Sequence, residues 1–100
     1  MRAPATKMNK LQNTITNTAY LFRVGAEGEG SRGLLDIINT ITSLLNGKDV
    51  QDAAIDKEDL SLLNDVAQAQ QRGDFIYIAD LLEYELPKSA LWKFVVDRIE

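Results

Sequence analysis

The stretch that most constrains the fold runs from Gly73 to Pro87 and reads Gly-Asp-Phe-Ile-Tyr-Ile-Ala-Asp-Leu-Leu-Glu-Tyr-Glu-Leu-Pro. Glycine is the residue type that most often closes a helix in a left-handed conformation, and the carboxylate of Asp74 can then cap a following helix. Pro87 has no amide hydrogen, so a helix that reaches it must end or kink there. This stretch therefore predicts a tight corner between two helices, followed by an interruption.

The rest of the chain has the apolar spacing that is typical of amphipathic helices. Apolar side chains recur three and four positions apart over residues 8–26, over residues 34–45 and again from Asp56 to Arg72. The stripe that starts after Gly73 continues beyond the proline to Ile99. We therefore predict an all-α fold, an antiparallel bundle of four or five helices.

The number of helices depends on Pro87. Either this proline is the first residue of a separate fifth helix, or the two segments form one helix with a kink. We favour a break, because the residue before a proline is biased away from helical backbone angles.

The domain boundaries follow from the same patterns. Residues 1–7 contain Pro4 and show no periodicity, so we expect a disordered lead-in. A chain of 100 residues is the size of one domain, which we place at residues 8–100. Residues 48–59 are rich in aspartate and are expected to form a polar connection before the third helix.

A glycine-rich run from Gly25 to Gly33 is expected to form a flexible turn between the first two helices. Part of it, Gly28-Glu-Gly30-Ser-Arg-Gly33, matches the G-x-G-x-x-G pattern of dinucleotide-binding loops. That pattern requires a strand before it and more strands after it, whereas helical periodicity lies on both sides here. Nucleotide binding at Gly28–Gly33 is therefore an alternative to the main prediction.

Composition excludes several kinds of chemistry. The chain has no cysteine and no histidine, which removes thiolate and imidazole ligands and the usual nucleophile and base pairs of hydrolases. We expect no cofactor, no metal site and no enzymatic activity. Residues 33–100 hold six basic and thirteen acidic side chains, which argues against nucleic-acid binding. No apolar run is long enough for a membrane span, so we expect a soluble, cytoplasmic protein.

The densest group of chemically capable side chains is Asp80, Glu83 and Glu85, together with Tyr77 and Tyr84. A small-molecule or metal-assisted enzyme that uses Asp80, Glu83 and Tyr84 is a second alternative. We expect instead a solvated acidic edge whose carboxylates pair with Lys88 or Lys93.

The last helix carries more apolar residues than one buried face consumes, and aromatic residues are enriched at protein interfaces. The predicted partner-binding residues are Tyr84, Trp92, Phe94, Val95 and Ile99, with Asp80 and Glu83 beside them. We therefore predict a non-enzymatic helical interaction module, adaptor or chaperone-like, whose partner is protein and which forms a dimer or larger homo-oligomer.

The sequence of Gly73–Pro87 resembles that of the C-terminal hairpin of small, uncharacterised all-helical proteins of Firmicute-type bacteria. In these proteins a corner of glycine, acid and aromatic residues precedes an A-D-L-L-E-Y-E-L helix, as it does here. Leu21–Gly25 and the leucine-rich segment after Gly33 are compatible with that family. The resemblance implies a compact helical bundle of unknown function and transfers no catalytic residue.

Overall fold

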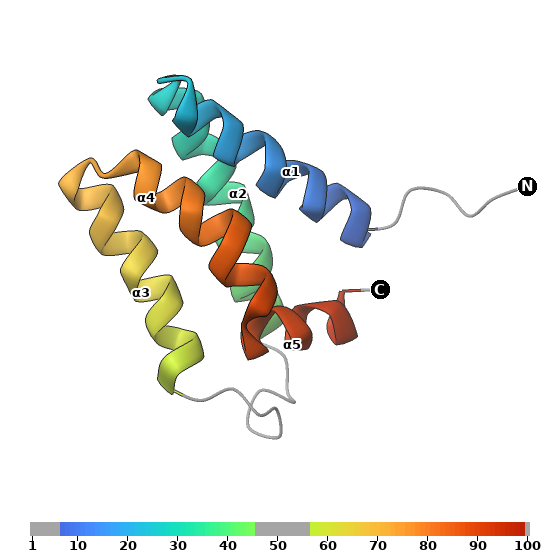
Figure 1. Cartoon of the computed structure of the whole chain (residues 1–100). Coiled ribbons are helices and arrows are strands. Elements are labelled where there is room, and N and C mark those ends of the chain that lie inside the picture. Colours follow the sequence, from blue (N-terminus) through green and yellow to red (C-terminus); the bar gives the residue numbers. More distant parts are fainter. Residues whose placement is uncertain (1–6, 46–56, 100) are drawn as a thin grey trace, which may run out of the picture.

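The computed structural model describes residues 7–45 and 57–99, and these residues form five α-helices and no strand (Figure 1). The helices are α1 (Lys7–Arg23), α2 (Glu27–Leu45), α3 (Lys57–Arg72), α4 (Phe75–Asp80) and α5 (Ala90–Arg98). A π-helical turn (Leu81–Glu85) and a 3₁₀ turn (Leu86–Lys88) connect α4 to α5. The predicted all-α bundle is confirmed.

The predicted lead-in and polar connection fall mostly outside the described residues. Of the lead-in, only Lys7 is described, and it begins α1 rather than preceding it. Of the connection, residues 57–59 belong to α3.

Helices α1 and α2 form a hairpin through a short turn at Gly25. Gly25 has a left-handed φ of +85°, and the amide of Ala26 donates to the carbonyl of Leu21 at 2.9 Å, which closes α1. Helix α2 begins only two residues after Gly25, at Glu27. The prediction of a glycine-rich turn that extends to Gly33 is therefore wrong, because Gly28, Gly30 and Gly33 all lie within α2.

The glycines of α2 allow close packing against α1. A Cβ atom at Gly30 would lie 2.8 Å from ring carbons of Phe22, and a Cβ atom at Gly33 would overlap the side chain of Thr18. Glycine within a helix costs about 1 kcal/mol relative to alanine. Here the closer packing of α1 against α2 offsets that cost. Side chains at Gly30 and Gly33 would hold the two helices further apart.

The corner at Gly73 has the predicted form. Gly73 adopts a φ of +73°, and the side chain of Asp74 accepts a hydrogen bond from the amide of Tyr77 at 3.4 Å. Immediately after this cap, the ring of Phe75 stacks on that of Phe22, with centroids 5.3 Å apart. The corner therefore places α4 against α1, and Figure 1 shows α4 lying between α1 and α3.

The predicted break near Pro87 occurs at Ser89, which has an extended backbone with φ of −82° and ψ of 156°. Pro87 is neither the first residue of the fifth helix nor the site of a simple kink, because it lies within the 3₁₀ turn. Leu86, the residue before it, keeps helical angles, contrary to the expected bias. The amide of Leu86 donates to the carbonyl of Leu81, five residues back, so the chain is in a widened turn when it reaches the proline ring.

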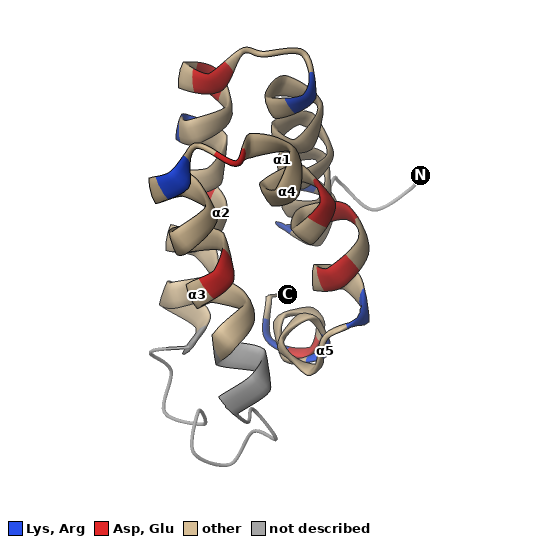
Figure 2. Ribbon diagram, turned by 60° about the vertical axis from the view of Figure 1, so that its left-hand side comes forward, with Lys and Arg blue, Asp and Glu red and all other residues tan. Residues whose placement is uncertain are grey.

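The core draws on all five helices and on the turns between α4 and α5. Helix α5 lies across the end of the bundle, as its end-on view in Figure 2 shows. It buries Leu91, Phe94 and Val95, and Ile99, the residue that follows the helix, is buried as well. Most of the apolar residues of the last helix that were expected on the surface are therefore buried in the core, because α5 packs against both α2 and α3. The other buried apolar side chains are Leu11, Ile15, Ala19, Phe22, Leu34, Ile37, Ile41, Val66, Ala69, Ile78, Ala79, Leu81, Leu82 and Leu86.

Within the described part of the chain, no helix has the length and hydropathy needed to cross a bilayer.

Candidate interaction surface

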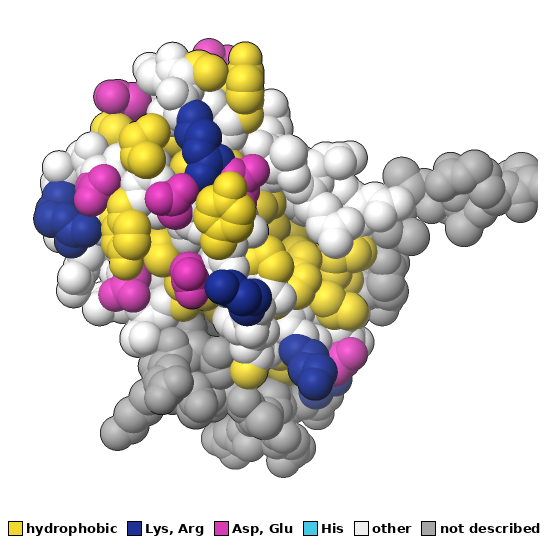
Figure 3. Space-filling model, viewed as in Figure 1, with side chains coloured by type: hydrophobic (Ala, Val, Ile, Leu, Met, Phe, Trp, Pro, Cys, Tyr) yellow, Lys and Arg dark blue, Asp and Glu magenta, His cyan; other side chains and the backbone are white. Residues whose placement is uncertain are grey.

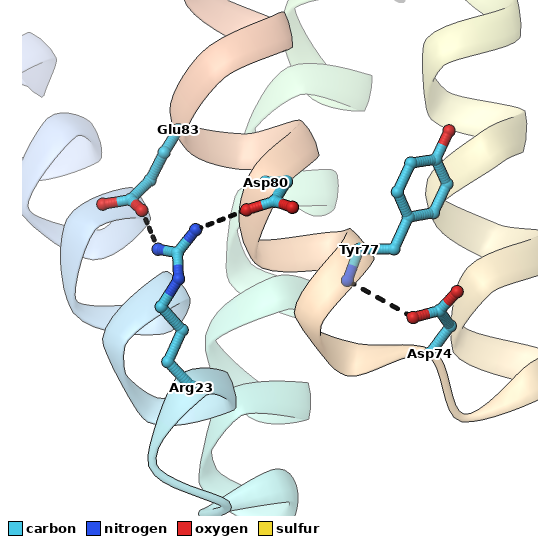
Figure 4. Close-up of polar contacts among 5 residues, drawn as sticks. All are labelled: Arg23, Asp74, Tyr77, Asp80 and Glu83. Carbon is cyan, nitrogen blue, oxygen red and sulfur yellow. Dashed lines mark hydrogen bonds and ion pairs between the residues drawn. The ribbon is translucent and has the colours of Figure 1, made fainter.

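The acidic residues singled out from the sequence meet at an arginine of α1. Arg23 donates from Nη2 to Oδ1 of Asp80 at 2.6 Å, and from Nη1 to Oε1 of Glu83 (Figure 4). The Arg23 guanidinium carbon also lies 5.9 Å from the centre of the Tyr84 ring. The predicted pairing of Asp80 and Glu83 with Lys88 or Lys93 is therefore wrong, although Glu85 does pair with Lys88, at 3.9 Å.

This arrangement limits what the carboxylates can do chemically. Both Asp80 and Glu83 accept hydrogen bonds from a fixed cation, so a role as acid, base or metal ligand would require Arg23 to move away first. Among the described residues, no group of three or more acidic side chains is placed to hold a metal ion. The two ion pairs instead link α1 to the segment that contains Asp80 and Glu83. Because the three side chains are partly exposed, these ion pairs contribute only modestly to stability.

The G-x-G-x-x-G stretch does not form a phosphate-binding loop. Such a loop presents free backbone amides at the start of a helix after a buried strand. Here α2 begins at Glu27 and follows another helix, and the last two glycines of the motif are packed against α1. The alternative of nucleotide binding at Gly28–Gly33 thus conflicts with the observed backbone.

The predicted partner-binding residues separate into buried and accessible groups. Phe94, Val95 and Ile99 are core residues, so they are not available to a partner unless the domain opens. Trp92 is partly buried against the core, whereas Tyr84 is 59% exposed. The accessible aromatic surface therefore comes mainly from the π turn.

Tyr84 and Trp92 line an open groove of about 510 Å³ between α1 and the segment around Pro87, which we name the Tyr84 groove. Figure 3 shows hydrophobic surface in this region, between α1 and α5. The remaining lining residues are Gln12, Asn13, Ile15, Thr16, Leu82, Glu83, Leu86 and Pro87.

The wall that α1 contributes to this groove is part of a larger surface without charge. Residues 11–22 contain no charged side chain, although 26% of the chain is charged and about three would be expected in twelve positions. Charge depletion combined with tyrosine is typical of the centres of protein interfaces. The exposed members of the stretch, which we name the α1 face, are Gln12, Asn13, Thr16, Asn17 and Tyr20.

Comparison with known families places this surface in an uncharacterised domain. The family described as "Domain of unknown function (DUF8042)" matches residues 5–90. The chain belongs to this family. No curated protein and no solved structure matches the chain. The resemblance to an uncharacterised helical family is thus supported at the level of a domain of unknown function, and its bacterial group stays a prediction.

In this DUF8042 domain the family match contains the whole α1 face and most of the Tyr84 groove, and it ends at the first residue of α5. The sequence prediction found Tyr84 but missed the α1 face. The apolar periodicity of the first helix identifies the side that points into the core and gives no information about the opposite, polar side. A signal was available there, since the charge-free run from Leu11 to Phe22 is visible in the sequence alone.

Proposed function

We propose that this DUF8042 domain is a non-enzymatic helical interaction module, adaptor or chaperone-like, that acts by binding protein and associates with itself. The observation that carries the proposal is the charge-free α1 face beside the exposed ring of Tyr84. A helix face that remained in water would be expected to carry charged side chains.

The chemistry of the α1 face suits burial against another protein. Amide and hydroxyl groups that find hydrogen-bond partners can be removed from water at much lower cost than charged groups. Tyr20, which is 60% exposed, combines a large apolar ring with a hydroxyl group. Tyrosine is among the residues that contribute most to binding energy at interfaces.

The neighbouring groove adds a surface whose shape is partly fixed in advance. The Arg23 guanidinium lies near the Tyr84 ring and is itself held between Asp80 and Glu83. Restricting a side chain before binding lowers the entropy lost when the complex forms. The exposed aromatic ring of Tyr84 is thus supported by an ion-pair network rather than left free.

Sedimentation velocity over a range of protein concentrations tests this proposal. We expect the wild type to form dimers or larger species at micromolar concentration, and Tyr20→Glu to shift the population towards monomer. Leu35→Glu is a matched control, because Leu35 is 57% exposed but lies on α2 and lines none of the grooves that α1 borders. A wild type that remains monomeric at about 100 μM would overturn the proposal.

A further inference from the structure

The wall that α1 contributes to the Tyr84 groove has hydrogen-bonding groups to offer a ligand. Its polar side chains are Gln12, Asn13 and Thr16, and all three are exposed. Within the described part of the chain, no hydrogen bond engages any of these side chains. Gln12 and Thr16 are four residues apart and therefore share one side of the helix. Amide and hydroxyl groups on this wall can donate to acceptors of a bound molecule.

The facing wall is built largely from rings. Tyr84 and Pro87 are exposed, and Trp92 is partly buried against the core. Grooves lined by aromatic residues are the surfaces on which proline-rich segments dock. Of the residues that line this groove, only Glu83 is charged, and its carboxylate is paired with Arg23. A charged ligand would therefore lose hydration without gaining a free counter-charge, whereas an uncharged ligand has no such cost.

We propose that the Tyr84 groove binds an uncharged, proline-containing segment of another protein in the extended polyproline II conformation. Rings of the ligand stack on Tyr84 and Trp92, while its carbonyl groups accept hydrogen bonds from Gln12, Asn13 and Thr16. This inference rests on one part of the proposed function, the binding of protein, and names the class of partner.

The backbone of a proline-containing segment matches the polar wall. A polyproline II helix makes no internal hydrogen bonds, so its carbonyl groups stay available to donors in the groove. Proline has no amide hydrogen, so such a segment presents mainly acceptors. An α-helical partner pairs its carbonyl groups internally and would not offer them to Gln12 or Thr16. The polar wall thus favours an extended segment over a helix.

The occupant is a separate protein because this chain has no proline-rich segment of its own. Its two prolines are Pro4 and Pro87, and Pro87 belongs to the groove itself. Polyproline II ligands dock through repeated prolines, as in the P-x-x-P pattern, and Pro4 has no second proline near it. Neither the N-terminal segment nor a second copy therefore supplies the expected ligand.

Titration with an end-capped decapeptide of proline tests this inference, and Trp92, the single tryptophan, reports on it from within the groove. The groove and the α1 face share Gln12, Asn13 and Thr16, so the protein is kept at about 1 μM to limit self-association. We expect a saturable change in Trp92 fluorescence with a dissociation constant below about 1 mM.

Two further peptides test the chemistry of the ligand. A capped glycine–serine decapeptide lacks the rings, and a proline decapeptide with two glutamates carries charge into the groove. Both should bind at least tenfold more weakly than the proline peptide. Equal affinity for all three peptides would overturn the proposed selectivity.

Variants that keep Trp92 locate the site with the same titration. Tyr84→Ala should weaken binding about tenfold because it removes a stacking ring, and Gln12→Ala should weaken it about threefold because it removes a donor. Ile76→Ala is the matched control, since Ile76 is 53% exposed but lies on α4 and does not line the Tyr84 groove. Its affinity should equal that of the wild type, and circular dichroism confirms that each variant is folded. Equal losses in Tyr84→Ala and Ile76→Ala would overturn the groove as the site.

The outcomes separate this inference from the proposed function. A wild type that dimerises but binds the proline peptide no better than the glycine–serine peptide would overturn the inference and leave the interaction module intact. A wild type that stays monomeric at about 100 μM and binds the proline peptide would overturn self-association and support the groove. If removing residues 1–6 raised the affinity for the proline peptide tenfold, the segment around Pro4 would be the occupant, and the separate partner would be overturned.

Discussion

Gly33 of α2 faces Thr18 of α1 so closely that a Cβ atom at Gly33 would overlap the hydroxyl oxygen of Thr18. Thr18 is itself buried, with 1% of its surface exposed. This contact sets how near α1 lies to α2, and both residues line the open groove between the two helices.

The first prediction compares a glycine of α2 that is packed against α1, Gly33, with one that is surrounded by open space, Gly28. Gly33→Ala should destabilise the domain by about 2 to 3 kcal/mol, because the methyl group forces the helices apart. Gly28→Ala is the matched control, since open space surrounds Gly28, and alanine there should stabilise the helix by up to about 1 kcal/mol. Urea unfolding followed by circular dichroism measures both, and equal effects of the same sign would contradict the close packing.

The second prediction concerns the left-handed turn residues. Gly25 and Gly73 have positive φ and no atom close enough to clash with an added methyl group. Gly25→Ala and Gly73→Ala should therefore each cost about 1 kcal/mol through backbone conformation alone, and asparagine at either position should cost less. Alanine variants as stable as the wild type would show that the turns can relax.

The third prediction concerns the cation that joins α1 to α4. Arg23→Met keeps an apolar stem but leaves Asp80 and Glu83 without their partner, and it should lower the free energy of unfolding by about 1 kcal/mol at low salt. The difference from the wild type should shrink in 1 M salt, because the side chains of the ion pairs are 31 to 50% exposed.

Lys88→Met provides the comparison for Arg23. It removes the more exposed and longer pair with Glu85, so its effect should be within about 0.5 kcal/mol of zero. If both variants lower the free energy of unfolding by the same amount, the ion pairs of Arg23 contribute no more than an ordinary surface pair.

The fourth prediction concerns the residue that starts α5. Ser89 accepts from the amide of Trp92 at 3.1 Å and donates to the carbonyl of Leu86 at 2.7 Å. Ser89→Ala removes both bonds and should cost about 1 kcal/mol, whereas Ser89→Asp keeps the cap and should cost less. Fluorescence of Trp92, the single tryptophan, follows the same unfolding transition. An alanine variant more stable than the aspartate variant would contradict the capping role.

Features that depend on neighbours in the sequence were predictable. The left-handed Gly73, the Asp74 cap and the helical stripes each result from interactions within a few residues, so the sequence alone determined the all-α class and the corner between α3 and α4. The interruption near Pro87 was also predictable. Its position was not, because the π turn before the proline let Leu86 remain helical.

Features that depend on distant segments were decided only by the tertiary structure. Gly30 and Gly33 look like helix breakers until α1 supplies the close contact that offsets their cost. Arg23 lies 57 residues from Asp80 and 60 residues from Glu83 in the sequence, so the local pattern assigned those carboxylates to nearby lysines instead.

The difference in exposure between Tyr84 and Phe94 is also decided by the tertiary structure. Both aromatic residues belong to segments with strong apolar patterns, yet packing buries Phe94 and leaves Tyr84 exposed. Periodicity shows which side of a helix is apolar, but only the positions of the other helices determine how much of that side they cover. The sequence by itself therefore determined the helices and their caps, while tertiary packing decided which surfaces remain for a partner.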